Sequence, residues 1–505
     1  MPIIGKLIKK SSELSYKRNF KKGRKYTSQL RSLFNLIDKA KETNFGKKYD
    51  FKELMINQKL VKTFQKNVPI TNYEEFYKNW LKKSIEGEKN HTWPGKISYY
   101  ALSSGTTGSP SKRIPVTKQM IRSFQKTSVN QSSTLYKLNL SENVYDAKIL
   151  VVGGSSQLKK IGQHYEGDLS GILKKNTAFI FNPFTKPNSN ITKITDWNKK
   201  MEKMIEKAPS WNIGIIAGVP SWCLMLMEKI IERYNLKTIH DIWPNFEVYM
   251  HGGVYMQPYI SRLNKIVGKK INLLDTYLAS EGYFAYQTSP DKNGMQLLLE
   301  NGIFYEFIPF TSEFFNEAGE LKDKHVAFNL SQVTKGVDYA LVITTNAGLW
   351  RYMIGDLVQF VDVEKYEIKI TGRIKQFLSL VGEHLSLDNI NQAINNVSKK
   401  FDVEILEFCL FANTEKQNHS WFISLDKKID KKLMIKELDK EIGELNDDYK
   451  TCRLHNLNPP NIEFIDVSKF YNYLEKNGKS GSQNKFPRVL NNEQAKNWIS
   501  YLEEN

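Results

Sequence analysis

The sequence contains few cysteines and no long apolar segment. Its 505 residues include only Cys223, Cys409 and Cys452, which lie far apart in the chain. Such spacing argues against a disulfide framework or a zinc site, and it suits a reducing cytosol. No apolar run reaches the length of a transmembrane helix, and the basic N-terminus lacks the apolar region and cleavage site of a signal peptide. We therefore expect a cytoplasmic protein that does not insert into a membrane.

Acidic residues are too few to balance the basic ones. Asp and Glu number 54 against 73 Lys and Arg, which gives a formal net charge of +19. A basic protein has non-specific affinity for nucleic acid, but the lysines are scattered and no cluster interleaves basic with aromatic residues. Solvated lysine surfaces are the preferred interpretation, and no nucleic acid partner is expected. The positive field would still attract polyanionic nucleotides.

The chain is long enough for a large core and more than one domain. Near the N-terminus, the spacing of Leu30, Leu33, Phe34 and Ile37 predicts one apolar helix face. Further on, buried-type strands that end in glycine or polar residues alternate with helical segments, which predicts an α/β fold with a parallel or mixed sheet. The expected strands include residues 149–152, 213–219, 246–250 and 271–274. Ligands of such sheets bind beyond the carboxyl ends of the strands.

The pattern of apolar and polar residues changes twice in the second half of the chain. From about Gly302 to Ile370 apolar and polar residues alternate, which predicts a region rich in strands. After Gly372 it becomes a small α/β unit of about 130 residues, a typical domain size. We predict an N-terminal domain over residues 1–372 and a C-terminal domain over residues 373–505.

A run of small and hydroxyl side chains, SSGTTGSPSK, begins at Ser103. Glycines let the backbone approach a ligand closely, and the N–H groups and hydroxyls of such a loop cradle phosphate oxygens. A lysine at its end adds a mobile positive charge. The spacing is not that of a Walker A loop, and the residues alone also fit a polar surface loop. The candidate phosphate contacts are Ser103, Ser104, Gly105, Thr106, Thr107 and Lys112.

Two carboxylates follow predicted strands and suit a nucleotide. Glu281 could hold Mg²⁺, because this hard cation prefers oxygen ligands beside phosphate. Thr276, Tyr277 and Ser280 add hydroxyls and a ring. Asp356 has two acceptor oxygens, which suit the two ribose hydroxyls. The residues alone fit a polar strand-to-helix turn at Glu281 equally well, and at Asp356 they also fit a β-turn after glycine.

These motifs resemble the signatures of the adenylate-forming superfamily. The run from Ser103 is similar to the first signature, and the segment around Glu281 is similar to the second. Residues 350–356 resemble the third, with Ile354 at a position where threonine is common. Together, the ordered signatures are more specific than any one of them.

The flanking sequences narrow the resemblance to the auxin-responsive family of acyl acid–amido synthetases. They are TNFGKKYDF, which begins at Thr43, and VPITNY, which begins at Val68. The resemblance extends from about Leu30 to Arg488. It implies a large N-terminal domain with mixed β-sheets and a β-barrel-like part, plus a small mobile α/β C-terminal domain.

Further residues acquire roles only through this resemblance. Gly252 and Gly253 lie in a loop similar to the one beside adenine, where His251 is a structural or pocket-wall residue. Lys375 falls on the hinge at which the C-terminal domain rotates between half-reactions. Lys485 resembles the lysine that bridges the acyl carboxylate and the α-phosphate as pyrophosphate leaves.

The reaction implied by the resemblance has two steps. A carboxylic acid attacks the α-phosphate of ATP, with Mg²⁺, to give an acyl-adenylate; an amino acid amine then displaces AMP. Catalysis would depend on Lys485, Lys375 and Glu281, in a protein that we expect to be a monomer. Two alternatives remain, an adenylate-forming acyl-CoA ligase with a thiol acceptor, and a basic nucleic-acid-binding protein that keeps a vestigial ligase fold.

Overall fold

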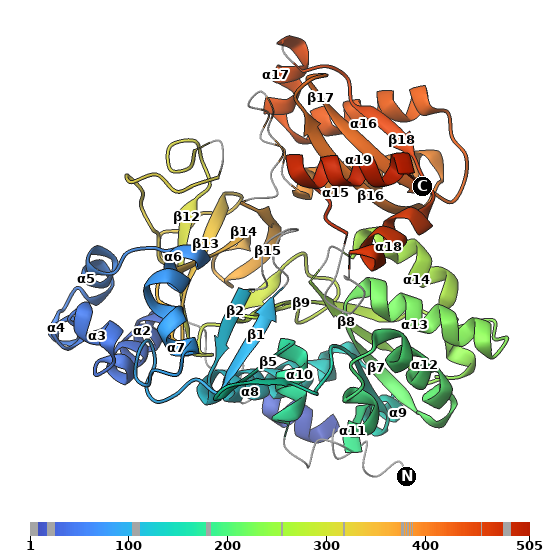
Figure 1. Cartoon of the computed structure of the whole chain (residues 1–505). Coiled ribbons are helices and arrows are strands. Elements are labelled where there is room, and N and C mark those ends of the chain that lie inside the picture. Colours follow the sequence, from blue (N-terminus) through green and yellow to red (C-terminus); the bar gives the residue numbers. More distant parts are fainter. Residues whose placement is uncertain are drawn as a thin grey trace.

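Helices and sheets form a large N-terminal part and a smaller C-terminal part in the computed structural model (Figure 1). The structure describes residues 9–17, 26–103, 112–177, 183–253, 256–316, 319–374, 378, 380, 383, 385, 387–455, 457–477 and 486–504. The described strands make three sheets, of eleven, four and three strands. The fold is therefore a mixed α/β fold, as predicted.

The main sheet joins a parallel half to an antiparallel half. Its parallel strands are β6 (Thr185–Lys186), β3 (Lys148–Val152), β7 (Ile213–Gly218), β8 (Val248–Gly252) and β9 (Asn272–Ala279). Its antiparallel strands are β10 (Gly282–Tyr286), β11 (Met295–Leu297), β15 (Glu367–Arg373), β14 (Tyr352–Asp362), β13 (Asp338–Thr345) and β12 (Ile303–Pro309). In this order the strands are neighbours in one sheet, so the β-barrel-like part that we expected is here the antiparallel half of a continuous sheet.

Three strands of the parallel half, β3, β7 and β8, are short, largely apolar runs that end at glycine or just before it. β7 has the sequence IGIIAG, and its first four residues are buried. Pro220 then starts the next helix directly, at a position where the missing N–H of proline costs nothing. The helices on this half are α9 (Glu142–Asp146), α11 (Ser189–Thr192), α12 (Trp197–Lys207), α13 (Pro220–Arg233) and α14 (Ile260–Ile266). The carboxyl ends of β3, β7 and β8 consequently meet at one edge.

A second sheet carries the predicted phosphate loop. Its strands, in order, are β2 (Lys112–Val116), β1 (Tyr99–Ser103), β5 (His164–Gly167) and β4 (Lys159–Ile161), accompanied by helices α8 (Lys118–Thr134) and α10 (Leu169–Lys175). β1 and β2 are antiparallel, and Ser103 lies opposite Lys112. The side chain of Thr117 caps α8 by accepting a hydrogen bond from the Met120 N–H. The two ends of the Ser103–Lys112 run are thus held by regular structure.

The first helices pack around a buried tryptophan. They are α2 (Tyr26–Ala40), α3 (Asn44–Lys48), α4 (Phe51–Ile56), α5 (Leu60–Asn67), α6 (Tyr73–Phe76) and α7 (Lys82–Ile85). The Phe45 and Phe51 rings lie 5.4 and 4.7 Å from the Trp350 ring. Leu33 and Ile37 are buried, which confirms the predicted helix, but Phe34 is 40% exposed and lies off the apolar face.

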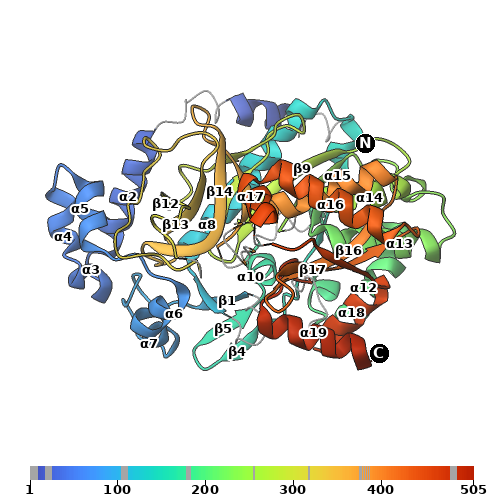
Figure 2. The ribbon, with the colours of Figure 1, turned by 90° about the horizontal axis from the view of Figure 1, so that it is seen from above.

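The C-terminal part has its own sheet and core. Its strands are β16 (Ile405–Asn413), β17 (Asn418–Leu425) and β18 (Asn461–Phe464), and its helices are α15 (Leu387–Phe401), α16 (Lys431–Leu445), α17 (Asp447–His455), α18 (Val467–Lys476) and α19 (Asn492–Glu504). Apolar residues of α15, α16 and the sheet form a separate buried cluster. Figures 1 and 2 show this part beside α14. A domain boundary at residue 372 stays a prediction.

No described helix is long and apolar enough to cross a membrane. Cys223, Cys409 and Cys452 are all free thiols, which agrees with the expectation that they form no disulfide framework.

Candidate functional site

A cavity of about 3540 Å³ lies at the carboxyl edge of the parallel strands. The ends of β3, β7, β8 and β9 line it, together with the facing ends of β1 and β2 and parts of β14 and β15. This is the edge at which parallel α/β sheets bind ligands. The cavity is several times larger than a usual small-molecule pocket of about 300–1,000 Å³. It therefore offers room for a nucleotide and a second substrate.

Glu281 lies in the tight turn between β9 and β10. The expectation that the strand ends near residue 274 was wrong, because β9 continues to Ala279 and pairs with β10 as a hairpin in which Gly282 lies opposite Ala279. A strand-to-helix turn at Glu281 is thereby also excluded. The side chain is buried, and burial, followed by the charge of Asp356, raises the pKa of Glu281 to about 7. The Tyr352 hydroxyl lies 3.5 Å from its Oε1.

Asp356 accepts hydrogen bonds on both carboxylate oxygens. The Tyr277 hydroxyl donates to Oδ2 at 2.7 Å, and Arg373 Nε donates to Oδ1 at 2.8 Å. Each oxygen has two lone pairs, so each retains one for a further donor such as a ribose hydroxyl. Asp356 lies within β14, which excludes the isolated β-turn that the residues alone allowed.

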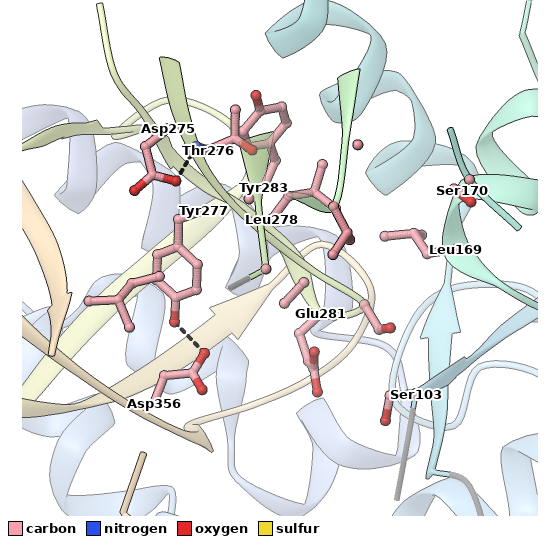
Figure 3. A pocket seen from close by; sticks show the side chains of 18 of the residues that line it. Ser103, Leu169, Ser170, Asp275, Thr276, Tyr277, Leu278, Glu281, Tyr283 and Asp356 are labelled. Atoms are coloured by element: carbon pink, nitrogen blue, oxygen red, sulfur yellow. Dashed lines mark hydrogen bonds between the residues drawn. The ribbon is translucent and has the colours of Figure 1, made fainter. Parts of the chain in front are cut away.

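The predicted carboxylates and the start of the phosphate loop border the same cavity. Figure 3 shows Glu281 between Asp356 and Ser103, and the Tyr277 hydroxyl reaches down to Asp356. Lys112 also lines the cavity, and its positive charge acts to lower the pKa of Glu281. The site thus combines two carboxylates with cations, an arrangement that suits a metal-bound polyphosphate.

Thr276, Gly252 and Gly253 line the cavity next to this group, as does Ser280. The Thr276 hydroxyl donates to the His251 carbonyl at 2.8 Å, so it is engaged between the two strands. A Cβ on Gly252 would lie 2.4 Å from the Thr276 carbonyl oxygen, and glycine is therefore required there by the close approach of β8 and β9.

His251 is a buried structural residue that does not line the cavity, although Met250 and Gly252 on either side of it do. Its imidazole is buried, and burial lowers its pKa to about 4. The ring is consequently neutral at physiological pH and is not a base of ordinary strength. Its Nδ1 lies 3.5 Å from Asp275 Oδ1.

Sequence reasoning missed three residues of the site: Asp275, Tyr352 and Arg373. Asp275 lines the cavity, and burial raises its pKa to about 7. Asp275 directly precedes the segment that begins at Thr276, so its position in the sequence could have indicated that it belongs to the site. The contact between Tyr352 and Glu281 joins residues that are distant in the sequence, for which local spacing carries no signal. Arg373 lies opposite Asp356 in the β14–β15 hairpin, so its contact depends on the register of that hairpin.

The remaining predicted residues lie outside the described part of the chain. They are Ser104, Gly105, Thr106, Thr107, Lys375 and Lys485. Among the described residues, no group of three His, Cys, Asp or Glu side chains could hold a metal ion. A cation at Glu281 would therefore need further oxygen ligands, such as phosphate oxygens and water.

The fold is similar to that of solved acyl acid amido synthetase and acyl-CoA ligase structures. A solved structure of "GH3.15 acyl acid amido synthetase" matches with a TM-score of 0.77 at 18% identity, over 95% of this chain and 93% of that one. A 2-hydroxyisobutyryl-CoA ligase in complex with 2-HIB-AMP matches with a TM-score of 0.61 at 11% identity, over 94% of this chain and 92% of that one. At these identities the likeness establishes the shared fold.

The chain belongs to the GH3 family. Residues 20–160 and 131–272 match the GH3 family N-terminal domain, residues 296–373 the central domain and residues 388–494 the C-terminal domain. These matches confirm the resemblance to the auxin-responsive synthetases.

Its curated relatives carry the names of ligases and amido synthetases. The indole-3-acetic acid-amido synthetase GH3.2 of Arabidopsis thaliana is 27% identical over 35% of this chain and 34% of its own length. The 4-substituted benzoates-glutamate ligase GH3.12 of Arabidopsis thaliana is 23% identical over 93% of this chain and 94% of its own length. The chain spans about a third of the length of several curated relatives that it matches, GH3.2 among them. The relatives give no support to the nucleic-acid alternative.

Proposed function

We propose that the chain is an acid–amino acid ligase that works through an acyl-adenylate. A carboxylic acid and ATP would give acyl-AMP and pyrophosphate, and an amino acid amine would then displace AMP to form an amide. The observation that carries this proposal is the position of Glu281, Asp356 and Lys112 around one cavity, in a chain that belongs to the GH3 family. The names of its relatives support the same reaction class.

The nucleoside would bind against β9 and β14. Asp356 would accept both ribose hydroxyls, because the Tyr277 and Arg373 donors hold its carboxylate in one orientation. Such fixed orientation reduces the entropy that substrate binding must offset. The adenine ring would lie beside Gly252, Gly253, Thr276 and Ser280.

The triphosphate would bind at the start of β2. Lys112 and residues 103–107 would contact phosphate oxygens through charge, hydroxyls and backbone N–H groups. Glu281 would hold Mg²⁺ there. The surroundings of the Glu281 carboxyl support a metal site there. Burial and the negative charge of Asp356 disfavour the ionised form of Glu281. A bound dication would stabilise this ionised form. When bound, Mg²⁺ neutralises phosphate charge.

Both steps would use positioning and electrostatics more than proton transfer. In the first, an oxygen of the acid forms a bond to the α-phosphorus while the bond to pyrophosphate breaks, and Lys485 would stabilise the developing negative charge. In the second, the amine nitrogen attacks the acyl carbonyl and AMP leaves. Lys375 would serve as the hinge between the predicted domains, residues 1–372 and 373–505.

Acid-dependent exchange of labelled pyrophosphate into ATP tests this function. A panel of carboxylic acids should include at least one that supports exchange, and amide formation should then require an amino acid and release AMP. Exchange followed by transfer to coenzyme A alone would identify an acyl-CoA ligase instead. Formation of ADP and phosphate with every acid would refute the proposal.

The same proposal includes three further properties. The enzyme would require Mg²⁺, it would be a monomer in the cytoplasm, and it would have no nucleic acid partner. Chelation should stop pyrophosphate exchange, and added Mg²⁺ should restore it. Light scattering after gel filtration should give the mass of one chain, about 58.6 kDa. Steep salt-dependent retention on nucleic acid without ATP turnover would contradict both the ligase function and the absence of this partner.

A further inference from the structure

A buried lysine in the wall of the cavity has no part in the proposed chemistry. Lys200 belongs to α12 and is only 2% exposed, yet it lines the cavity. Its Nζ donates to the Gly153 carbonyl at 2.6 Å and to the Gly154 carbonyl at 2.8 Å. These glycines directly follow the last residue of β3. Lys200 therefore reaches from α12 to the edge of the sheet at which the substrates would bind.

The Lys200 ammonium has no counter-charge in direct contact. Among the described residues, Nζ contacts the two neutral carbonyls and forms no ion pair with a carboxylate. Burial lowers the pKa of Lys200 to about 8, and the charge of Asp168 opposes this effect only in part. A buried charge without a paired counter-charge is costly. An anion that enters the cavity with a substrate would therefore stabilise the ammonium.

One N–H of Lys200 is available for such an anion. An ammonium has three N–H donors, and the carbonyls of Gly153 and Gly154 accept from two of them. Within the part of the chain that the structure describes, no other acceptor takes a hydrogen bond from Nζ. The third N–H can therefore donate to a ligand in the cavity.

The glycine turn that holds Lys200 is fixed from its other side by α10. The Gly154 N–H donates to the Ser170 hydroxyl oxygen at 2.8 Å, and the Ser170 hydroxyl donates to Asp168 Oδ1 at 2.8 Å. Asp168 also caps α10 by accepting from the Ser170 N–H. A Cβ on Gly154 would clash with the Asp168 carboxylate. The turn is thus closely packed, and its carbonyls hold the ammonium in one position.

Positive side chains outnumber negative ones in this part of the cavity. Of the described residues between 144 and 229 that line it, four are lysines and one is a carboxylate, that of Asp168. The lysines are Lys174, Lys186, Lys200 and Lys229. Such an excess of positive charge attracts anions and raises their local concentration.

Two tryptophans form an apolar wall beside Lys200. The rings of Trp197 and Trp222 lie 4.7 Å apart, and both residues line the cavity. The Trp197 ring lies 5.9 Å from Lys200 Nζ. We call the space bounded by Lys200, the two glycines and the two tryptophans the lysine pocket.

The lysine pocket is separate from the proposed ribose site. Ser170, which contacts the glycine turn, lies on the opposite side of Glu281 from Asp356 (Figure 3). A ligand group at Lys200 is therefore not the ribose. A triphosphate carries several charges and needs several donors, so a single remaining N–H suits a carboxylate better.

We propose that the lysine pocket binds a substrate carboxylate, other than the one that is adenylated, through the Lys200 ammonium. This inference rests on the proposed function, which supplies two sources of such a group. One is the second carboxylate of a dicarboxylic acid, and the other is the carboxylate of the acceptor amino acid. In both cases the third N–H of Lys200 donates to a carboxylate oxygen, and the tryptophan rings contact the adjoining carbon chain. Lys200 is then a specificity-determining residue.

Pyrophosphate exchange without an amino acid tests the first source. Dicarboxylic acids are compared with their monomethyl esters, which keep one carboxyl for adenylation. A hydrogen bond between two charged groups should favour the diacid in kcat/KM on the order of 10-fold or more. Lys200→Met, which removes the charge and keeps the length of the side chain, should abolish this preference and leave the monoester unaffected.

Amide formation from chemically prepared acyl-AMP tests the second source. Amino acids are compared with their carboxamides, which keep the amine and lose the carboxylate. If the acceptor supplies the group, the wild type should prefer the amino acid on the order of 10-fold or more. Lys200→Met should then abolish this preference through a higher KM for the amino acid, with pyrophosphate exchange unchanged.

Lys269→Met is the matched control. Lys269 Nζ also donates to a backbone carbonyl, that of Pro244 at 2.9 Å, but Lys269 does not line the cavity. Its loss should leave both preferences unchanged. Equal losses for charged and neutral substrates in Lys200→Met would overturn the proposal, because Lys200 would then only support the turn. So would a rise in the KM for ATP with every acid, since the pocket would then bind phosphate. A wild-type protein with neither preference would overturn the proposal even if Lys200→Met failed to fold.

Thermal unfolding separates this inference from the proposed function because it needs no turnover. At equal ionic strength, glutarate should raise the Tm of the wild-type protein more than the neutral glutaramide does. Lys200→Met should remove this difference, and Lys269→Met should keep it. If the wild type adenylates no acid, the proposed function fails and this comparison still tests the pocket. Equal effects of glutarate and glutaramide on the wild type, or an unchanged difference in Lys200→Met, would refute it.

Discussion

Arg351→Met should strongly destabilise the large part, because it leaves a buried carboxylate without its partner. The Arg351 guanidinium donates to both oxygens of Glu306, through Nε at 3.2 and 3.0 Å and Nη2 at 2.9 Å. Nη1 donates to the carbonyls of Gln65 and Val68 at 2.7 and 2.6 Å. Glu306 is fully buried and Arg351 is 3% exposed.

The magnitude follows from this geometry. Removal of one partner from a buried ion pair typically costs about 3–5 kcal/mol. Gln65 Nε2 also donates to Glu306 Oε1, at 2.9 Å, and would still do so in the variant. We therefore expect the free energy of unfolding to fall by about 3 to 4 kcal/mol, toward the lower end of that range.

The candidate site should be affected through the neighbouring residue. The Arg351 carbonyl accepts a hydrogen bond from the Thr71 N–H, and the Met353 N–H donates to the Thr71 carbonyl. The residues on both sides of Tyr352 are therefore hydrogen-bonded to the backbone of Thr71. The Tyr352 hydroxyl in turn lies beside Glu281. Loss of the guanidinium should therefore weaken nucleotide binding even at temperatures where the variant stays folded.

Urea unfolding, followed by the fluorescence of buried tryptophans such as Trp350, measures the effect. The double variant Arg351→Met with Glu306→Leu is the control, since replacement of both charges by apolar side chains is often close to neutral. It should recover most of the lost stability. Wild-type stability of the single variant, or a double variant no more stable than the single one, would refute the reasoning.

Three further changes test the site. Asp356→Asn should raise the KM for ATP by about 10- to 100-fold without unfolding the protein, since the amide keeps one acceptor but loses the charge that Arg373 pairs with; circular dichroism and ATP titrations check both. Lys485→Ala should suppress acyl-AMP formation yet still convert supplied acyl-AMP to amide, as single-turnover assays would show. In metal-free protein, Glu281→Gln should stabilise the fold at pH 8 but not at pH 4. The pKa of Glu281 is raised from 4.5 to about 7 in the folded protein, so the wild type loses stability as the pH rises through that interval. Urea unfolding midpoints of the variant and the wild type at the two pH values test this.

Three strands of the parallel half, β3, β7 and β8, were predictable because their signals are local. Each is a short run of largely apolar residues that ends at glycine or just before it. β7 was expected at residues 213–219 and lies at Ile213–Gly218. Phe34 shows the limit of such patterns, since it fits the helical period but its side chain is 40% exposed.

The hairpin at Glu281 could not be predicted in the same way. The residues after the strand could continue it or start a helix, and the choice depends on pairing with β10, which in turn pairs with β11. Arg373 lies opposite Asp356 in the register of the β14–β15 hairpin, whereas the contact between Tyr277 and Asp356 joins β9 and β14, which are not neighbours in the sheet. The motifs pointed to Glu281 and Asp356, which line one cavity in the structure. The donors around these carboxylates come from tertiary structure.

These donors explain how two nearby carboxylates can have different roles. Asp356 receives strong hydrogen bonds from Tyr277 and Arg373, so its charge is satisfied within the protein and its free lone pairs are oriented for hydroxyl groups. Glu281 is equally buried, but its side-chain contact with Tyr352 is long, at 3.5 Å, and its pKa rises to about 7. A buried carboxyl with few donors is stabilised most in its ionised form by a cation that is supplied with the substrate. The proposed division of roles, with ribose bound by Asp356 and a metal by Glu281, would therefore follow from the number and strength of donors that the fold places beside each carboxylate.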